Sequence, residues 1–306
     1  MHLKILGSAA GGGFPQWNCA CPNCRAARRS NSTHKARSQA QLAVSSDGTF
    51  WFLLGASPDL RSQIESCAEL QPRNGSRSSP IAGVVLAGAD IDHTLGLLLL
   101  RELQPLQVYA TDSVIHVLRD NNSMFGMLNR VPDQVRWQSI KPDQSFPLQI
   151  VGGENARISC LPIPLSSRYP AFVQNSALNP DEAVLGLILT SDSGKRVGYF
   201  PNVAELSEEL VRQLNTVDLL LFDGTFYSDD ELIHAQGSGQ CAREMGHIPV
   251  SGSDGSLRQL AAIAGPRKMY IHINNTNPML DESSAEHAEV RNAGWELAED
   301  GWQTTL

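Results

Sequence analysis

The side chains best suited to chemistry lie in one short stretch, residues 88–97, which contains Asp90, Asp92 and His93. An apolar run over 81–86 precedes this stretch and four leucines follow, a pattern that predicts a buried strand, a polar loop and a helix. Ligands of α/β proteins bind beside the carboxyl ends of strands, where this loop would lie. Two carboxylates and one imidazole in four residues favour a metal or catalytic site, because buried charges need partners or a cation. The alternative is that Asp90 or Asp92 caps the helix, since Asp is a favoured N-cap residue.

A second group of metal-binding side chains is the CxCxxC motif formed by Cys19, Cys21 and Cys24. Three thiolates in this spacing can face one centre, because the turn between the last two cysteines brings them together. We therefore predict a zinc knuckle at 19–24 with a closed, structural zinc ion, against the alternative of free thiols or a disulfide. Zinc takes four ligands, so the fourth must come from His34 or from a residue of the last core strand.

Two further apolar runs lead to polar residues of the same kind. The run 217–222 leads into Asp223, and the run 268–273 delivers His272 together with the asparagine-rich segment that follows. Both runs are predicted strands, so Asp223 is a candidate for metal binding or acid–base chemistry at a strand end. His247 is a candidate for moving protons near neutral pH. For both histidines the alternative is a buried, hydrogen-bonded residue without chemistry.

Roughly a dozen predicted strands alternate with helices, which predicts an α/β fold. Asp-Gly and Ser-Gly turns between apolar runs predict hairpins within 41–54 and 184–200. Helices follow each hairpin-rich stretch, which favours a four-layer αββα sandwich over one doubly wound sheet. The sequence has no repeat and no linker, so we predict one domain over residues 1–306.

Some helices and loops are also predicted from local patterns. Ser57 would cap a helix that runs to about residue 70, a further helix would cover 254–264, and the tail 282–302 would form an acidic helix and a closing segment. The aperiodic segments 121–132 and 166–180 are predicted to be a mobile flap and a substrate lid, because long loops in compact domains are often functional.

Composition and charge exclude several classes of function. The net charge of −8 and the pI of about 5.5 argue against binding to nucleic-acid backbones, which needs a basic surface. No apolar run is long enough to span a membrane. The N-terminus is typical of a first strand and not of a signal peptide. We therefore expect a cytoplasmic protein, in which 42% hydrophobic residues allow a sizeable core.

The 88–97 stretch resembles the end of the HxHxDH motif of metallo-β-lactamase-fold hydrolases. Asp92 and His93 match the last two motif positions, whereas Gly88 and Asp90 stand where the first two histidines would be. The rest of that family's site agrees in chain order with Asp223, His247 and His272. The two missing histidines argue against a hydrolase with two zinc ions.

The whole chain resembles more closely the coenzyme PQQ (pyrroloquinoline quinone) synthesis protein B family. Five stretches carry the resemblance in order: 11–21, 90–98, 222–226, 245–249 and 272–278. The resemblance implies a metallo-β-lactamase fold, the structural zinc and a role in PQQ synthesis beside other PQQ-biosynthesis proteins. It implies hydroxylation, with iron and oxygen, of the tyrosine moiety of a crosslinked Glu-Tyr precursor. The alternative is a carrier that assists release or transport of PQQ without catalysis.

The expected site residues follow from this resemblance. His93, His272 and one carboxylate, either Asp90 or Asp92, would form a two-histidine, one-carboxylate set that leaves open positions on Fe(II). The expected catalytic residues are Asp92, His93, Asp223 and His247. The candidate cations for the anionic precursor are Arg25, Lys141 and Arg168, without a ranking among them. The candidate fourth group at the zinc is Asn275.

Overall fold

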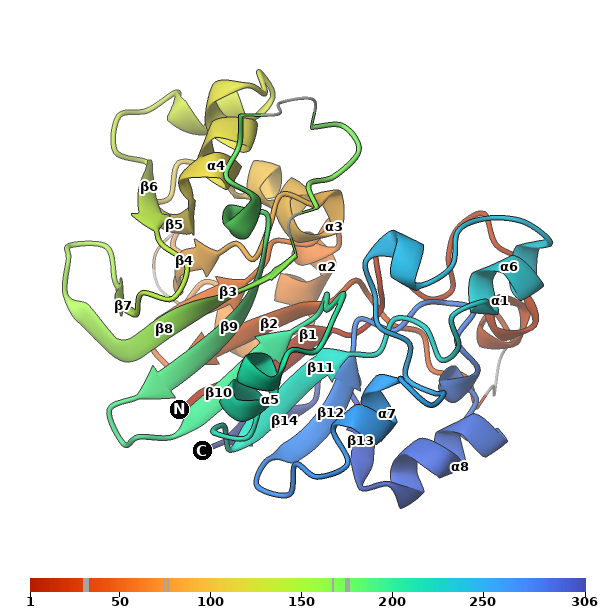
Figure 1. Cartoon of the computed structure of the whole chain (residues 1–306). Coiled ribbons are helices and arrows are strands. Elements are labelled where there is room, and N and C mark those ends of the chain that lie inside the picture. Colours follow the sequence, from red (N-terminus) through yellow and green to blue (C-terminus); the bar gives the residue numbers. More distant parts are fainter. Residues whose placement is uncertain (30–32, 74, 76, 167, 174–176) are drawn as a thin grey trace. The chain divides into compact units, whose positions relative to one another are not determined.

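The computed structural model describes residues 1–29, 33–73, 75, 77–166, 168–173 and 177–306. The chain divides into two compact units (Figure 1). Unit 1 consists of Met1–Gly7, Gln41–Lys195 and Gly301–Leu306, and unit 2 consists of Ser8–Ala40 and Arg196–Asp300. The single domain expected over residues 1–306 stays a prediction, and the units are described in turn.

Unit 1 contains a seven-stranded mixed sheet. Its strands are β1 (His2–Gly7), β2 (Gln41–Ser45), β3 (Trp51–Leu54), β4 (Ile81–Val85), β5 (Leu106–Thr111), β6 (Val135–Ile140) and β14 (Gln303–Thr305). They lie in the order β14-β1-β2-β3-β4-β5-β6, antiparallel as far as β3 and parallel from β3 to β6. Every residue of β2 to β5 is buried, as expected of strands that are covered on both faces.

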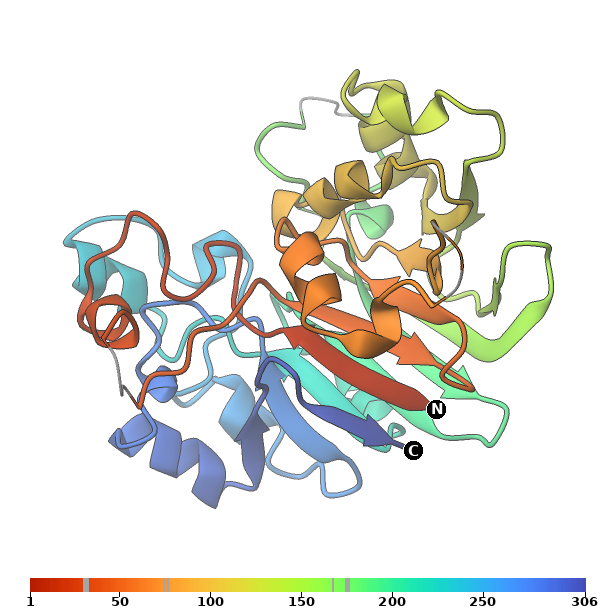
Figure 2. The same ribbon diagram turned by 180° about the vertical axis from the view of Figure 1, so that it is seen from behind.

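Helices cover one face of this sheet (Figure 2). They are α2 (Leu60–Glu65), η1 (Ala68–Leu70), α3 (Ile91–Thr94), η2 (Leu95–Leu100), α4 (Asp112–Ile115), η3 (His116–Asp120) and η4 (Phe125–Asn129). Leu60 of α2 and Leu97 of η2 join Leu53 and Val84 of the sheet in one buried cluster. The core of unit 1 therefore lies directly beneath the helical segment that follows β4.

Three further strands of unit 1 pair antiparallel with one another. They are β7 (Phe146–Gln149), β8 (Asn155–Ser166) and β9 (Val184–Ser191), and η5 (Pro180–Glu182) lies just before β9. The segment predicted as a substrate lid starts at Ser166, which the structure assigns to β8. Residues 167 and 174–176 of that segment lie outside the described residues.

Unit 2 is built on four parallel strands, which neighbour one another in sequence order. They are β10 (Arg196–Phe200), β11 (Leu219–Asp223), β12 (Arg267–Ile271) and β13 (Trp295–Leu297). The helices are α1 (Pro22–Ala27), α5 (Glu208–Leu214), α6 (Glu231–Gln236), η6 (Arg243–Met245), α7 (Ser256–Gln259), η7 (Pro278–Leu280) and α8 (Ala285–Asn292). Because the strands are parallel, the loops after β10, β11 and β12 leave the same edge of the sheet.

Three aromatic side chains pack together on neighbouring strands of unit 2. Tyr270 and Trp295 stack with ring centroids 4.2 Å apart, and Phe222 meets Trp295 edge-on at 6.2 Å. All three are buried. Asp223 follows Phe222 directly and His272 follows Tyr270 by two residues, so this packing fixes the strand ends that carry candidate site residues.

The helix predicted to start at Ser57 begins instead at Leu60. The Ser57 hydroxyl donates to Gln63 Oε1 at 2.9 Å, and its backbone N–H donates to Gln41 Oε1 at 2.8 Å. Ser57 is fully buried, so its side chain serves this internal network and does not cap the helix.

One other helix prediction was too long. The helix expected over 254–264 is reduced to Ser256–Gln259, and Asp254 lies before it with its carboxylate 2.8 Å from Arg243. The tail over 282–302 contains strand β13 besides helix α8. Trp295 draws that segment into the sheet because its ring is buried in the aromatic core.

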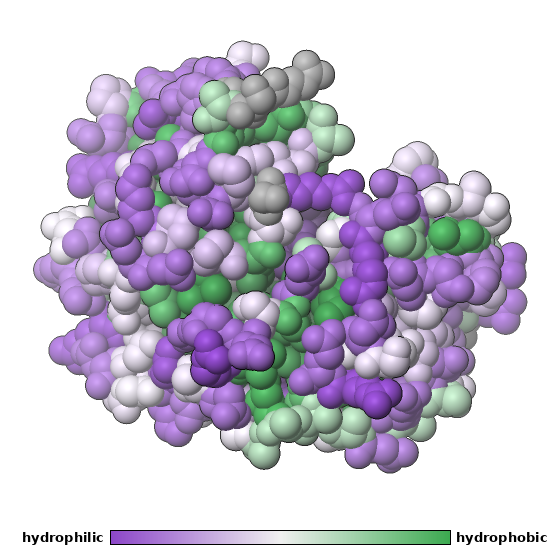
Figure 3. All heavy atoms as spheres, in the orientation of Figure 1, coloured by the Kyte–Doolittle hydropathy of each residue, from purple (hydrophilic) through white to green (hydrophobic). Residues whose placement is uncertain are grey.

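Hydrophilic residues cover most of the face seen in Figure 3. Among the described residues, no helix is both long enough and apolar enough to cross a membrane.

Candidate metal centre

The predicted site residues are divided between the two units. Asp90, Asp92 and His93 belong to unit 1. Unit 2 holds Asp223, His247, His272 and the three cysteines. Each group is described within its own unit, and the combined set of His93, His272 and one carboxylate stays a prediction.

The loop after β4 carries the unit 1 residues in the predicted order of strand, loop and helix. Asp90 occupies the N-cap position of α3, but among the described residues its carboxylate makes no hydrogen bond that caps the helix. Asp92 lies in the first turn, with its Oδ2 3.8 Å from Nε2 of the buried His93. The capping alternative therefore loses its main support, since the side chain does not perform that function.

Two glycines, Gly55 and Gly96, allow the backbone after β3 to lie close to His93 and to hydrogen-bond with the segment that carries it. The Ala56 N–H donates to the His93 carbonyl at 2.7 Å, and the Gly96 N–H donates to the Ala56 carbonyl at 2.8 Å. Gly55 has a φ of +81°, and a Cβ there would lie 3.4 Å from His93 Nδ1. A Cβ on Gly96 would overlap the Ser57 carbonyl oxygen. Gly96 is thus required because the backbone at Ala56 and Ser57 approaches it too closely for a side chain.

In unit 2, Asp223 ends β11 and is completely buried. Its Oδ2 accepts from the Val203 N–H at 2.8 Å and lies 2.8 Å from His247 Nδ1. Its Oδ1 accepts from the N–H of Thr225 at 3.0 Å and from the Thr225 hydroxyl at 2.7 Å. A carboxylate offers about four acceptor positions, and all are used here.

These contacts keep Asp223 ionised. Burial raises its pKa, but the attraction and hydrogen bond of His247, the attraction of His272 and the Val203 N–H together bring that pKa below its ordinary value. A saturated, ionised carboxylate is better suited to orienting its neighbours than to transferring protons. The geometry therefore favours a positioning role over the acid–base role suggested by the sequence.

The hydrogen bonds also determine which nitrogen of each histidine carries a lone pair. His247 Nδ1 faces a carboxylate, so it must donate, which leaves Nε2 as the nitrogen that can carry a lone pair. The Thr225 hydroxyl donates its only proton to Asp223, so it accepts from His272 Nδ1 at 2.8 Å. In His272, too, Nε2 is therefore the nitrogen that can bind a metal.

The two imidazoles are nearly parallel. Their ring centroids are 5.6 Å apart and their planes differ by 23°. Ligand-type atoms of Asp223, His247 and His272 lie within 4.8 Å of one another. Metal-binding histidines commonly donate their second N–H to a carboxylate or other acceptor, which is the arrangement found for both rings.

Thr225 is the site residue that the sequence did not reveal. Its hydroxyl links Asp223 to His272, yet a threonine after Asp-Gly carries no recognisable motif. His272 itself adopts a φ of +61°, which is uncommon for a residue other than glycine. Such a conformation persists only where neighbouring contacts hold it, and it occurs often at functional sites.

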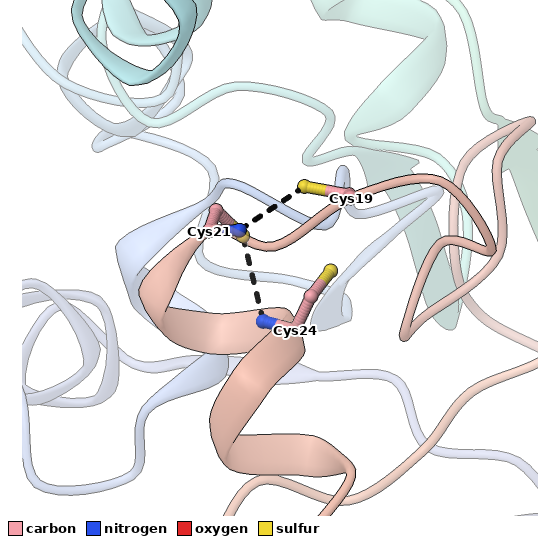
Figure 4. Close-up of side chains that lie close together, drawn as sticks. All are labelled: Cys19, Cys21 and Cys24. Atoms are coloured by element: carbon pink, nitrogen blue, oxygen red, sulfur yellow. Dashed lines mark hydrogen bonds between the residues drawn. The ribbon is translucent and has the colours of Figure 1, made fainter.

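The three knuckle cysteines gather at the start of helix α1 (Figure 4). Their sulfurs lie within 4.8 Å of one another. The Nδ2 atom of Asn275 lies 3.2 Å from the sulfur of Cys19, 3.7 Å from that of Cys21 and 3.3 Å from that of Cys24. The Asn275 amide thus lies beside all three sulfurs as a hydrogen-bond donor, and its role as the fourth group at the zinc stays a prediction.

The crowded sulfurs titrate unequally. Burial, together with the neighbouring Cys21, raises the pKa of Cys24 to about 11. Burial also raises the pKa of Cys19, but hydrogen bonds from Cys21, Cys24 and Asn275 bring it below its ordinary value. Three cysteine sulfurs gathered at one point suit zinc, for which thiolates are typical ligands. Rotation of the Asn275 amide about its last bond would present its oxygen to the same point.

The candidate cations for an anionic substrate are unequal. Lys141 is 2.7 Å from the carboxylate of Asp112 and is therefore already paired. Arg25 and Arg168 are exposed.

The predicted flap over 121–132 contains the helix η4, so part of it has regular structure.

Comparisons with known proteins show which sequences and structures this chain is similar to. A family model described as a β-lactamase superfamily domain matches residues 50–273. The chain is 41% identical over 304 residues to coenzyme PQQ synthesis protein B of Methylorubrum populi, covering 98% of each sequence. It is 39% identical over 308 residues to the protein of that name from Acinetobacter baumannii, covering 100% of each.

Solved structures extend the comparison to three dimensions. The crystal structure of Zn²⁺-bound PqqB from Methylobacterium extorquens superposes with a TM-score of 0.91 at 39% identity, covering 100% of both chains. A diphosphatase of the PhnP family has a TM-score of 0.67 at 19% identity, which shows the fold alone. The predicted α/β sandwich of the metallo-β-lactamase type is confirmed by these matches.

Replacing Gly96 should destabilise the protein through the loop that holds His93. We expect Gly96→Ala to lower the free energy of unfolding by about 1–3 kcal/mol, because its Cβ must displace backbone. Gly126→Ala is the matched control, since a Cβ there meets no described atom within 4 Å. Denaturant unfolding of both variants measures the effect, and equal stabilities would contradict the close approach.

Removal of the Thr225 hydroxyl should weaken metal binding at His247 and His272. Thr225→Val keeps the side-chain shape, and we expect about 10–100-fold lower affinity for Co²⁺ because the outer partner of His272 is lost. Thr216→Val is the control, since its hydroxyl donates to the Gln213 carbonyl at an exposed position. Titration followed by visible absorption measures the affinity. An affinity equal to that of the control would rule out the proposed role of Thr225.

Proposed function

The chain belongs to the coenzyme PQQ synthesis protein B family within the β-lactamase superfamily, and from this premise we propose that it is a metal-dependent hydroxylase in PQQ synthesis. Its substrate is a crosslinked Glu-Tyr precursor, of which the tyrosine moiety is hydroxylated. Other proteins of PQQ biosynthesis supply this precursor and receive the product.

The observation that carries this proposal is the pair of parallel imidazoles, His247 and His272, with both Nδ1 atoms held by hydrogen bonds. Two imidazoles whose Nε2 atoms are left for a metal fit Fe(II), for which sets of two histidines and one carboxylate are typical. Bound Fe(II) with open coordination positions would supply the activation of molecular oxygen. His93, Asp90 and Asp92 stay predicted ligands of the same metal.

The side chains around the two imidazoles have definite tasks in this proposal. Asp223 accepts a hydrogen bond from His247 Nδ1, which fixes the orientation of that ring and leaves its Nε2 for the metal. Thr225 accepts a hydrogen bond from His272 Nδ1 and donates its own proton to Asp223, so it fixes the orientation of His272 in the same way. Asp223 and Thr225 are buried, so water does not replace these contacts during a reaction cycle.

We further propose that the knuckle binds a structural zinc ion through Cys19, Cys21 and Cys24, with the side chain of Asn275 as the fourth group. The contacts of Asn275 with all three sulfurs support this assignment. The similar protein PqqB of Methylobacterium extorquens is Zn²⁺-bound in its crystal structure, which is consistent with it.

A carrier of PQQ without catalysis is the second candidate. It is favoured by the depleted loop after β4, where Gly88 and Asp90 stand in place of two motif histidines. A carrier needs only to bind and release PQQ, so the two candidates differ in their dependence on oxygen.

The deciding experiment is reconstitution with Fe(II) without oxygen, followed by addition of oxygen and the crosslinked precursor. We expect oxygen uptake and a precursor that gains the mass of oxygen. His247→Ala should also bind iron more weakly. Loss of an outer partner typically lowers metal affinity about 10–100-fold, and we expect a larger decrease here because a ligand itself is removed. His234→Ala, at an exposed position of α6, is the control and should behave as the unchanged protein.

The alternative outcomes separate the two candidates. Absence of both oxygen uptake and mass gain would exclude the hydroxylase. Tight PQQ binding that survives His247→Ala, again without turnover, would instead support the carrier.

Loss of one knuckle thiol should lower both the zinc content and the stability. We expect Cys21→Ser to lose its zinc and to unfold at a lower denaturant concentration, because structural zinc contributes folding energy directly. Cys241→Ser changes a half-exposed thiol outside the knuckle and serves as the control. Metal analysis that finds one zinc per chain in Cys21→Ser would refute the assignment.

A further inference from the structure

The loop over residues 272–277 is bound on one side by the zinc knuckle. Asn23 lies in the knuckle, and its Nδ2 donates to the backbone carbonyls of Asn275, at 3.2 Å, and of Asn277, at 2.9 Å. One amide group therefore donates hydrogen bonds to two carbonyls of the loop that begins with His272. Asn23 lies between Cys21 and Cys24 in the sequence. An ion bound by these two sulfurs would therefore restrict the backbone at Asn23 and hold its amide in place.

The same loop is bound on its other side by the turn that contains Thr225. Asn277 is completely buried, and its Nδ2 donates to the carbonyls of Gly224, at 3.0 Å, and of Thr225, at 3.2 Å. The Asn274 N–H also donates to the Thr225 carbonyl, at 3.0 Å. The backbone of Thr225 is thus set by the asparagine-rich loop, while its hydroxyl sets His272.

These bonds form one continuous path of contacts. It runs from the cysteines through Asn23 to the carbonyl of Asn277, through the side chain of Asn277 to Thr225, and from Thr225 to His272. His272 needs such support, because its left-handed φ of +61° costs free energy that only surrounding contacts can offset.

We propose that Asn23 and Asn277 are positioning residues through which zinc in the knuckle sets the metal affinity of the His247–His272 pair. This inference rests on the proposed function only in requiring that both sites bind metal. A bound zinc ion orders the knuckle, and Asn23 then holds the loop in the form that presents His272. Coupling of this kind between two sites is typically 5–150-fold in affinity.

The test measures Co²⁺ binding to zinc-loaded protein by visible absorption, in the absence of any substrate. We expect Asn23→Ala to weaken Co²⁺ affinity about 5-fold or more, with zinc still bound in the knuckle. Asn23→Asp keeps the shape but replaces the donor by an acceptor, so it should have the same effect. Asn18→Ala is the matched control, because Asn18 is an exposed asparagine of the same segment whose side chain accepts from Gln16.

A double-mutant cycle distinguishes coupling from independent damage. Cys21→Ser removes the zinc and should weaken Co²⁺ affinity by a similar factor, while Cys21→Ser combined with Asn23→Ala should weaken it no further. The imidazole ¹H–¹⁵N signals of His272 should shift in Asn23→Ala and not in Asn18→Ala, a change that general loss of stability would not produce. If Cys21→Ser does not fold, the comparison of Asn23→Ala with Asn18→Ala decides alone.

The outcomes separate this inference from the proposed function. Equal Co²⁺ affinity in Asn23→Ala and Asn18→Ala would overturn the inference and leave the function standing. Binding of zinc alone, with no Co²⁺ site that His272→Ala abolishes, would overturn both. Weakened affinity in Asn23→Ala beside a negative oxygen assay would support the inference and reject the hydroxylase.

Discussion

The carboxylate of Asp223 is the group on which the structure of unit 2 depends most. A fully buried charge is costly unless hydrogen bonds satisfy it, and this one accepts four. The donors come from the loop after β10, from the turn after β11 and from His247. Three segments that are distant in sequence are therefore held at one point, because each supplies a bond that the charge requires. Removal of any one donor would leave part of a buried ion unsatisfied.

The parallel sheet explains why these segments meet. Parallel strands send their carboxyl ends to one edge, and the stacked rings of Tyr270 and Trp295 with Phe222 beside them fix the relative heights of β11, β12 and β13. Asp223 and His272 follow directly from these strands. The aromatic packing thus fixes where Asp223 and His272 lie, and the hydrogen bonds of Asp223 and Thr225 determine which histidine nitrogens carry a proton.

The sequence predicts the strands better than the helices, for a physical reason. A buried strand such as β2 or β10 is a short apolar run between turn residues, and both lie within the stretches 41–54 and 184–200 that were predicted to form hairpins. Helix starts depend on what a capping side chain contacts, and the Ser57 hydroxyl bonds to the buried side chain of Gln63, six residues further on. A bond of this spacing belongs to no helix-capping motif, so the sequence pattern does not reveal it.

The candidate site divides in the same way. Asp223, His247 and His272 are predicted because chemically reactive residues follow apolar runs or match family stretches, and the structure brings these three side chains together. Thr225 was missed, because a hydroxyl becomes important only through the two groups that it joins. Asp223 is predicted from the sequence to bind metal or transfer protons; its four occupied acceptor positions favour a positioning role over proton transfer, and metal binding stays a prediction.

The loss of histidine from the loop after β4 has a cause in the backbone of unit 1. Gly88 forms a bridge with Val184, and a Cβ at Gly88 would lie 3.0 Å from the Ala183 carbonyl oxygen. A Cβ at position 88 would therefore press on the segment before β9, which the Leu185 N–H also ties to Ala87 at 2.7 Å. A histidine there would require this segment to shift by a few tenths of an ångström. The missing imidazole is thus part of how this unit packs, which argues against restoring a hydrolase with two metal ions by a simple substitution at this position.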